Sequence, residues 1–136
     1  MSKKIYLSEN HTRSLSSSLI VVEKYLLELE DMFLKQNDSC CNELVKDIDE
    51  ELIASNLSAI QEAKDKICAL AEKYGTLKEK LSLQRVINAK RTKIWEILKD
   101  TLSKRTKGYG TFPKKFVEEY DADINKLIEI TNKINY

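Results

Sequence analysis

Apolar residues recur at helical spacing along almost the whole chain. In the first segment, predicted to be a helix over residues 8–36, successive apolar positions are four, three, four, three and four residues apart. That spacing is typical of helices that pack side by side. The stripe consists of Leu15, Leu19, Val22, Leu26, Leu29 and Phe33, and Leu27 and Leu34 widen it. A single helix cannot cover so long a stripe, so the pattern predicts partner helices.

The second helix is predicted to begin at a capping box formed by Asp47 and Glu50 and to run to Tyr74. Gly75 stands where a left-handed helix stop is expected. The inner face of this helix is expected to consist of Ile53, Leu57, Ile60, Ala63, Ile67, Ala71 and Tyr74. Residues 38–47 fit either a helix or an extended segment.

A third helix is expected directly after this stop. Thr76 and Glu79 form another capping box, which predicts a tight antiparallel turn and a helix that ends near Lys104. The core positions of this helix are expected to be Leu83, Ile87, Ile94, Leu98 and Leu102, flanked by Val86 and Trp95.

The last helix follows an interruption. Residues 108–113 hold two of the three glycines and the only proline of the chain. Pro113 suits the first turn of a new helix, and Asp121 is a candidate cap within it. The inward positions are expected to be Ile124, Leu127, Ile128, Thr131 and Ile134. The fold prediction is therefore all-α: one domain over residues 1–136, built as a four-helix up-and-down antiparallel bundle with long helices.

Charge is strongly polarised although the net charge is only +1. Residues 38–75 hold four basic and nine acidic side chains, whereas residues 76–110 hold ten basic and three acidic ones. This polarity either selects the pairing of the second and third helices or forms a face for phosphate. Lys90, Arg91 and Lys93 spread around the third helix, so part of its positive surface is expected to stay exposed.

The inventory of reactive side chains argues against an enzyme. His11 is the only histidine, and the cysteines Cys40, Cys41 and Cys68 lack the Cys-x-x-Cys spacing of zinc sites. We therefore predict no catalytic residue, no metal and no cofactor. Cys68 falls between core positions and is expected to be buried.

The chain is expected to be cytoplasmic and not to enter a membrane. An odd number of cysteines, two of them adjacent, does not suit a disulfide framework. The apolar run over residues 19–22 ends at Glu23, which makes it too short for a membrane span.

The segment 104–115 departs most from regular helix. It resembles a phosphate-binding glycine loop only superficially, because it follows a helix and lacks the remaining motif residues. Two interpretations stay open. Tyr109 and Phe112 either fold back and plug the end of the bundle, or form an exposed patch beside Arg105 and Lys107 that binds a partner.

The expected function is a non-catalytic protein–protein interaction or self-association, with a homodimer as the expected state. The alternative is a nucleic-acid-associated regulator that uses the basic third helix and the 104–115 loop. The predicted partner-binding residues are Arg105, Lys107, Tyr109, Phe112, Lys90, Arg91 and Lys93.

Overall fold

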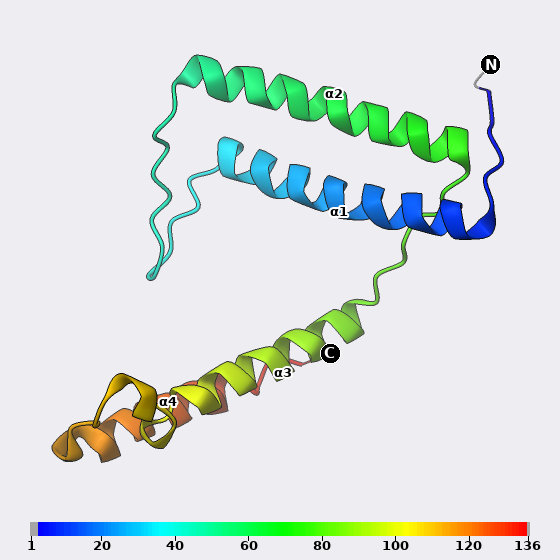
Figure 1. Cartoon of the computed structure of the whole chain (residues 1–136). Helices are drawn as coiled ribbons and strands as arrows, with labels where there is room; N and C mark the ends of the chain where they lie inside the picture. Colours follow the sequence, from blue (N-terminus) through cyan, green and yellow to red (C-terminus); the bar gives the residue numbers. More distant parts are fainter. Residues whose placement is uncertain (1–2, 136) are drawn as a thin grey trace. The chain divides into compact units, whose positions relative to one another are not determined.

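The computed structural model of the chain describes residues 3–135, and all regular structure within that range is helical, which confirms the predicted all-α class (Figure 1). Four α-helices are present there: α1 Glu9–Leu34, α2 Glu50–Tyr74, α3 Leu83–Thr101 and α4 Val117–Thr131. The chain divides into two compact units, Met1–Glu79 and Lys80–Tyr136, which we call the N-terminal hairpin and the C-terminal hairpin.

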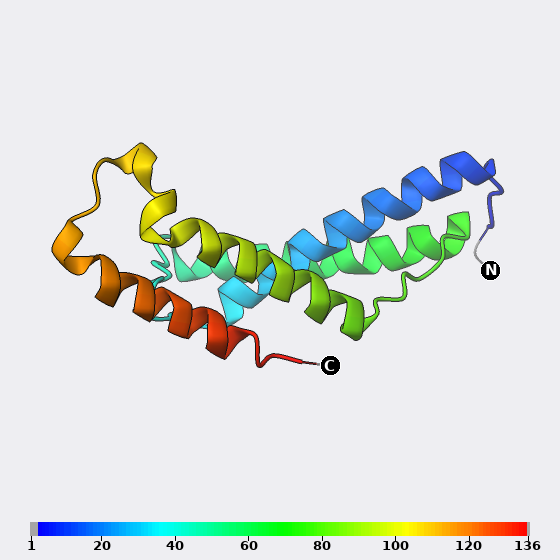
Figure 2. The same cartoon turned by 90° about the horizontal axis from the view of Figure 1, so that it is seen from below.

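In the N-terminal hairpin, α1 and α2 lie side by side and antiparallel (Figures 1 and 2). The contact is centred on Ile60, which is only 5% exposed. A partly buried ion pair between Lys64 and Glu30, at 3.1 Å, joins the two helices. Two predictions for α1 are wrong, because Val22 and Leu29 are exposed. A helix with a single neighbour covers only the strip that faces that neighbour, and these two residues lie beside it.

The start of α2 differs from the prediction, whereas its end agrees. The cap is Asp49 rather than Asp47, and its side chain makes no capping hydrogen bond. At the other end, Gly75 adopts φ 65° and its N–H bonds back to Ala71 and Glu72, which confirms the left-handed stop. Cys68 is exposed, so its predicted burial is wrong. It lies on the side of α2 that turns away from α1.

Residues 35–49 form an irregular loop between α1 and α2. Residues 38–47, which fitted either a helix or an extended segment in the sequence, therefore contain no regular element. Asp38 organises this loop. Its carboxylate accepts hydrogen bonds from the Leu44 amide at 3.0 Å and from Gln36 Nε2 at 2.8 Å. These two donors, the amide first, hold the pKa of Asp38 below its ordinary value.

In the C-terminal hairpin, α3 and α4 lie side by side and antiparallel (Figure 2). Leu102 and Ile128 are its most buried apolar residues. Leu83, Leu127 and Ile134 were predicted to point inward but are exposed. Leu127 lies beside the contact strip, as on α1, whereas Leu83 is the first residue of α3 and Ile134 lies beyond the end of α4. The predicted capping box at Thr76 is also wrong. Ser82 caps α3 by accepting from the Arg85 amide at 3.3 Å.

The connection between α2 and α3 is longer than expected. Residues 76–82 contain no helix, so the tight turn predicted there is not formed. Leu77 and Leu81 in this connection are 85% and 74% exposed. The two helix pairs observed are thus α1 with α2 and α3 with α4.

Candidate partner-binding surface at the α3–α4 turn

The chain passes from α3 to α4 through three short 3₁₀ turns. They are η1 Ser103–Arg105, η2 Lys107–Tyr109 and η3 Lys114–Phe116. The predicted interruption at residues 108–113 is therefore confirmed. Gly110 adopts φ 108° and ψ −176°, a conformation that is essentially restricted to glycine. Pro113 directly precedes η3.

Asp121 fixes the first of these turns. Its carboxylate accepts from the Ser103 amide at 2.9 Å and from Ser103 Oγ at 2.7 Å. The two bonds from Ser103, the amide first, lower the pKa of Asp121 below its ordinary value. Asp121 was predicted to cap its own helix, but it lies inside α4 and caps η1 across the hairpin.

A second clamp joins the same two elements. Tyr120 Oη donates to the Thr101 carbonyl at 2.6 Å, at the end of α3 where helix carbonyls lack helical partners. The rings of Tyr120 and Phe112 lie 4.6 Å apart between centroids. Phe112 therefore folds back onto the hairpin, whereas Tyr109 is 95% exposed. The predicted folding back thus holds for Phe112 and the predicted exposure for Tyr109, while binding of a partner by Tyr109 stays a prediction.

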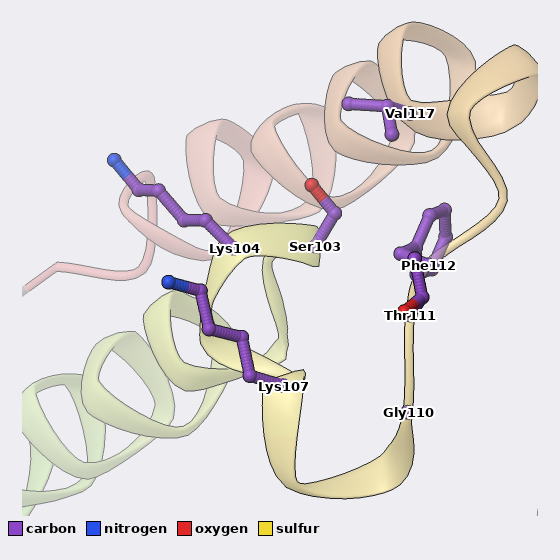
Figure 3. Close-up of a pocket in the computed structure, with 7 residues that line it drawn as sticks. All are labelled: Ser103, Lys104, Lys107, Gly110, Thr111, Phe112 and Val117. Atoms are coloured by element: carbon purple, nitrogen blue, oxygen red, sulfur yellow. The ribbon is translucent and has the colours of Figure 1, made fainter.

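A hollow of about 490 Å³ opens inside the turn (Figure 3). Its lining comprises Ser103, Lys104, Lys107, Gly110, Thr111, Phe112 and Val117, with no acidic residue. In Figure 3 the side chains of Lys104 and Lys107 extend away from Phe112. Within residues 3–135, neither ammonium group forms a salt bridge. The turn thus presents two cationic side chains beside an apolar wall, and one of them, Lys104, also attracts the Asp121 carboxylate.

A second hollow, of about 480 Å³, lies on the α3 side of the turn and shares Lys104 with the first. Its other lining residues are Trp95, Glu96, Lys99, Asp100, Leu102 and Arg105. The Lys99 ammonium lies 5.6 Å from the centroid of the Trp95 ring, a cation–π distance. Residues 99–115 hold six basic side chains and a single acidic one, so this end of the hairpin is a concentrated basic surface.

Apart from Phe112, which packs on Tyr120, the predicted partner-binding residues fall into three groups. Arg105, Lys107 and Tyr109 are exposed on the turn, and Lys90 and Lys93 are exposed on α3. Arg91 differs from these five, because it is half-buried and its Nη2 donates to the Asn132 carbonyl at 3.2 Å. A cation at this position also suits the negative end of the α4 dipole. Arg91 therefore stabilises the hairpin.

Three residues of the turn were missed from the sequence: Thr101, Ser103 and Tyr120. Each makes a hydrogen bond to a residue 18 or 19 positions away. No periodic or capping pattern marks such a pair. The only signal in the sequence is a hydroxyl residue next to a helix end.

Within residues 3–135, no cluster of three His, Cys, Asp or Glu side chains is arranged to hold a metal ion. None of the described helices combines the length and the apolar character needed to cross a bilayer. The chain has no significant match to a known protein-family model, to a curated protein or to a solved structure. Its function is therefore argued from its own residues.

Proposed function

We propose that the protein is a non-catalytic helical interaction protein that associates with itself. The observation that carries this proposal is the exposure of large apolar side chains on regular helices of both hairpins. On α1 they include Val22, Tyr25, Leu29 and Met32, and on α3 and α4 they include Leu83, Ile97, Leu127 and Ile130, each at least 44% exposed. Contiguous apolar surface of this kind is characteristic of protein interaction sites.

Apolar surface gains roughly 25 cal/mol for each Å² removed from water, and a hairpin of two helices offers each helix only one neighbour. Three apolar residues are buried among those described, Ile60, Leu102 and Ile128. Helices that carry apolar side chains outside the hairpin contact gain free energy when these side chains pack against further helices.

We further propose that, in the associated state, each N-terminal hairpin packs face to face against a C-terminal hairpin to complete an up-and-down four-helix bundle. The charges at the turn ends support this arrangement. Residues 38–51 hold six acidic side chains and one basic, whereas residues 99–115 hold six basic and one acidic. In an up-and-down bundle the first and third turns lie at the same end, so the acidic turn and the basic turn would meet.

The test is sedimentation equilibrium of the purified full-length chain over micromolar concentrations. The proposal predicts reversible formation of a species heavier than the 15.7 kDa chain. A single species of chain mass at every concentration would remove the proposal. The exposed free thiols of Cys40, Cys41 and Cys68 support a reducing compartment, and we propose a cytoplasmic location.

A second function, binding of nucleic acid, is favoured by one observation. Lys90 and Lys93 are exposed on α3, and residues 80–136 hold thirteen basic and seven acidic side chains. Binding through phosphate contacts weakens steeply with added salt. The double variant Lys90→Glu/Lys93→Glu should abolish a salt-sensitive gel shift, and unchanged binding would rule this function out. Arg91 is left intact because it holds the end of α4.

A further inference from the structure

The N-terminal hairpin carries a second apolar stripe beside its helix–helix contact. On α1 the stripe consists of Val22, Tyr25, Leu29 and Met32, which are three, four and three residues apart and 45–59% exposed. On α2 the matching positions are Leu52, Ala59, Ala63 and Leu70. At 3.6 residues per turn, each stripe lies about a quarter turn from the line that faces the other helix.

Both stripes lie on the same side of the hairpin. Seen from its own N-terminus, each helix carries its stripe anticlockwise from the contact line. Because α1 and α2 are antiparallel, the same rotation leads to the same side of the pair. The N-terminal hairpin therefore presents one apolar face that is two helices wide.

The C-terminal hairpin repeats this arrangement. Its second stripe consists of Leu83, Val86 and Ile97 on α3 and of Leu127 and Ile130 on α4, all exposed. Seen from the N-terminus of each helix, the stripe on α3 and the stripe on α4 again lie about a quarter turn anticlockwise from the contact line. This hairpin also presents one apolar face, and Lys90 lies within it.

Charge selects which faces pair. Residues 1–79 hold ten basic and fifteen acidic side chains, whereas residues 80–136 hold thirteen and seven. Two N-terminal hairpins would repel each other, and so would two C-terminal hairpins, whereas an N-terminal and a C-terminal hairpin attract. The acidic turn at residues 38–51 and the basic turn at residues 99–115 favour a pairing that brings these two ends together.

Because this inference starts from the proposed self-association, the attracting hairpin is assigned to a second copy. Leu77 and Leu81 are among the most exposed residues of the described chain. In a dimer with exchanged hairpins, the two connections run past each other near the twofold axis, where these leucines can cover their counterparts.

We propose that two copies of the chain form a reciprocal dimer, in which the apolar face of each N-terminal hairpin packs against the apolar face of the C-terminal hairpin of the other copy. This inference rests on the proposed self-association and names its partner and its surfaces. Each copy supplies one acidic and one basic hairpin, and when both pairings form between the same two copies the assembly closes at two chains.

The test uses two full-length variants, each with one face disrupted. Leu29→Glu/Met32→Glu alters the N-terminal hairpin, and Leu127→Glu/Ile130→Glu alters the C-terminal hairpin. Each variant alone should associate at least about 100-fold more weakly, since central apolar residues dominate such interfaces. An equimolar mixture should recover a dimer, because one intact face of each kind is then available.

A fluorophore on Cys68, on a Cys40→Ser/Cys41→Ser background, allows mixed dimers to be followed by fluorescence-detected sedimentation.

The control is Leu27→Glu/Leu34→Glu, which alters the opposite side of α1 and should leave the dimer intact. Leu27 is as exposed as Leu29, at 45% against 46%. If the wild type dimerises but one face variant still dimerises alone, like faces pair; the inference is then wrong while self-association stands. If the wild type is a monomer, both proposals fail. Far-UV circular dichroism confirms that each variant retains its helices.

A second double variant tests the exchange without touching either face. Leu77→Ser/Leu81→Ser lies outside all four helices, so both hairpins should fold as in the wild type. We expect its dimer to dissociate about tenfold more readily, because the counterpart leucines lose their cover. An unchanged dissociation constant would show that the connections do not meet, and would overturn the exchanged arrangement.

Discussion

Replacing Gly110 by alanine tests the account of the α3–α4 turn most sharply, because a matched control lies two residues away. Gly110 has φ 108° and ψ −176°, whereas Gly108 has no positive φ and lies within the 3₁₀ turn η2. An added Cβ meets no other atom within 4 Å at either position. Any difference between the two variants therefore comes from backbone conformation rather than from steric contact.

The magnitude follows from that conformation. A non-glycine residue held in the region of Gly110 costs about 1–3 kcal/mol. Alanine at a compatible glycine position stabilises a protein by about 0.4–1 kcal/mol, because the unfolded chain loses freedom. Gly110→Ala should lower the free energy of unfolding, and Gly108→Ala should raise it slightly. Urea unfolding followed by circular dichroism and by the fluorescence of Trp95 measures both. Equal stabilities, within about 0.5 kcal/mol, would refute the reasoning.

Three further predictions concern the same packing. Tyr120→Phe keeps the ring contact but removes the hydrogen bond to Thr101, so it should lower the free energy of unfolding by about 0.5–1.5 kcal/mol in urea; no change would mean that this clamp contributes nothing. Ile60→Ala should cost about 2–5 kcal/mol as a cavity in the N-terminal hairpin, and a loss below about 1 kcal/mol would contradict its place in the core. The lowered pKa of Asp121 means that its carboxylate stabilises the fold above its unfolded pKa and that this stability is lost as the pH falls through the folded pKa. A pH series of unfolding should thus show a smaller acid-induced loss in Asp121→Asn than in the wild type, and equal losses would contradict this role.

Features encoded by one or two neighbouring residues could be predicted from the sequence. Gly75 ends α2 and Gly110 breaks the chain before α4, because glycine adopts positive φ most readily. The inward residues nearest the hairpin contact, such as Ile60 and Ile128, followed from helical periodicity.

Features that depend on a choice between equal local signals, or on distant partners, could not be predicted. Thr76 and Ser82 are both good helix caps, and only the structure shows that Ser82 is used. Asp121 serves a turn 18 residues away in the sequence, and no spacing rule connects it to Ser103. Val22 has the periodicity of a core residue but is exposed, because a stripe does not say how many neighbours will cover it. At the candidate site, the exposure of Tyr109 and the hydrogen bond from Arg91 to Asn132 both depend on where the hairpin places these residues.

The central claim is that this helical chain associates with itself through apolar faces of opposite net charge. Sedimentation equilibrium of the full-length wild type, repeated at about 0.05 M and 0.5 M sodium chloride, tests it most directly. The account predicts a reversible dimer of twice the 15.7 kDa chain mass that weakens as salt screens the attraction. A monomer at both salt concentrations, or a dimer that tightens with salt, would contradict it.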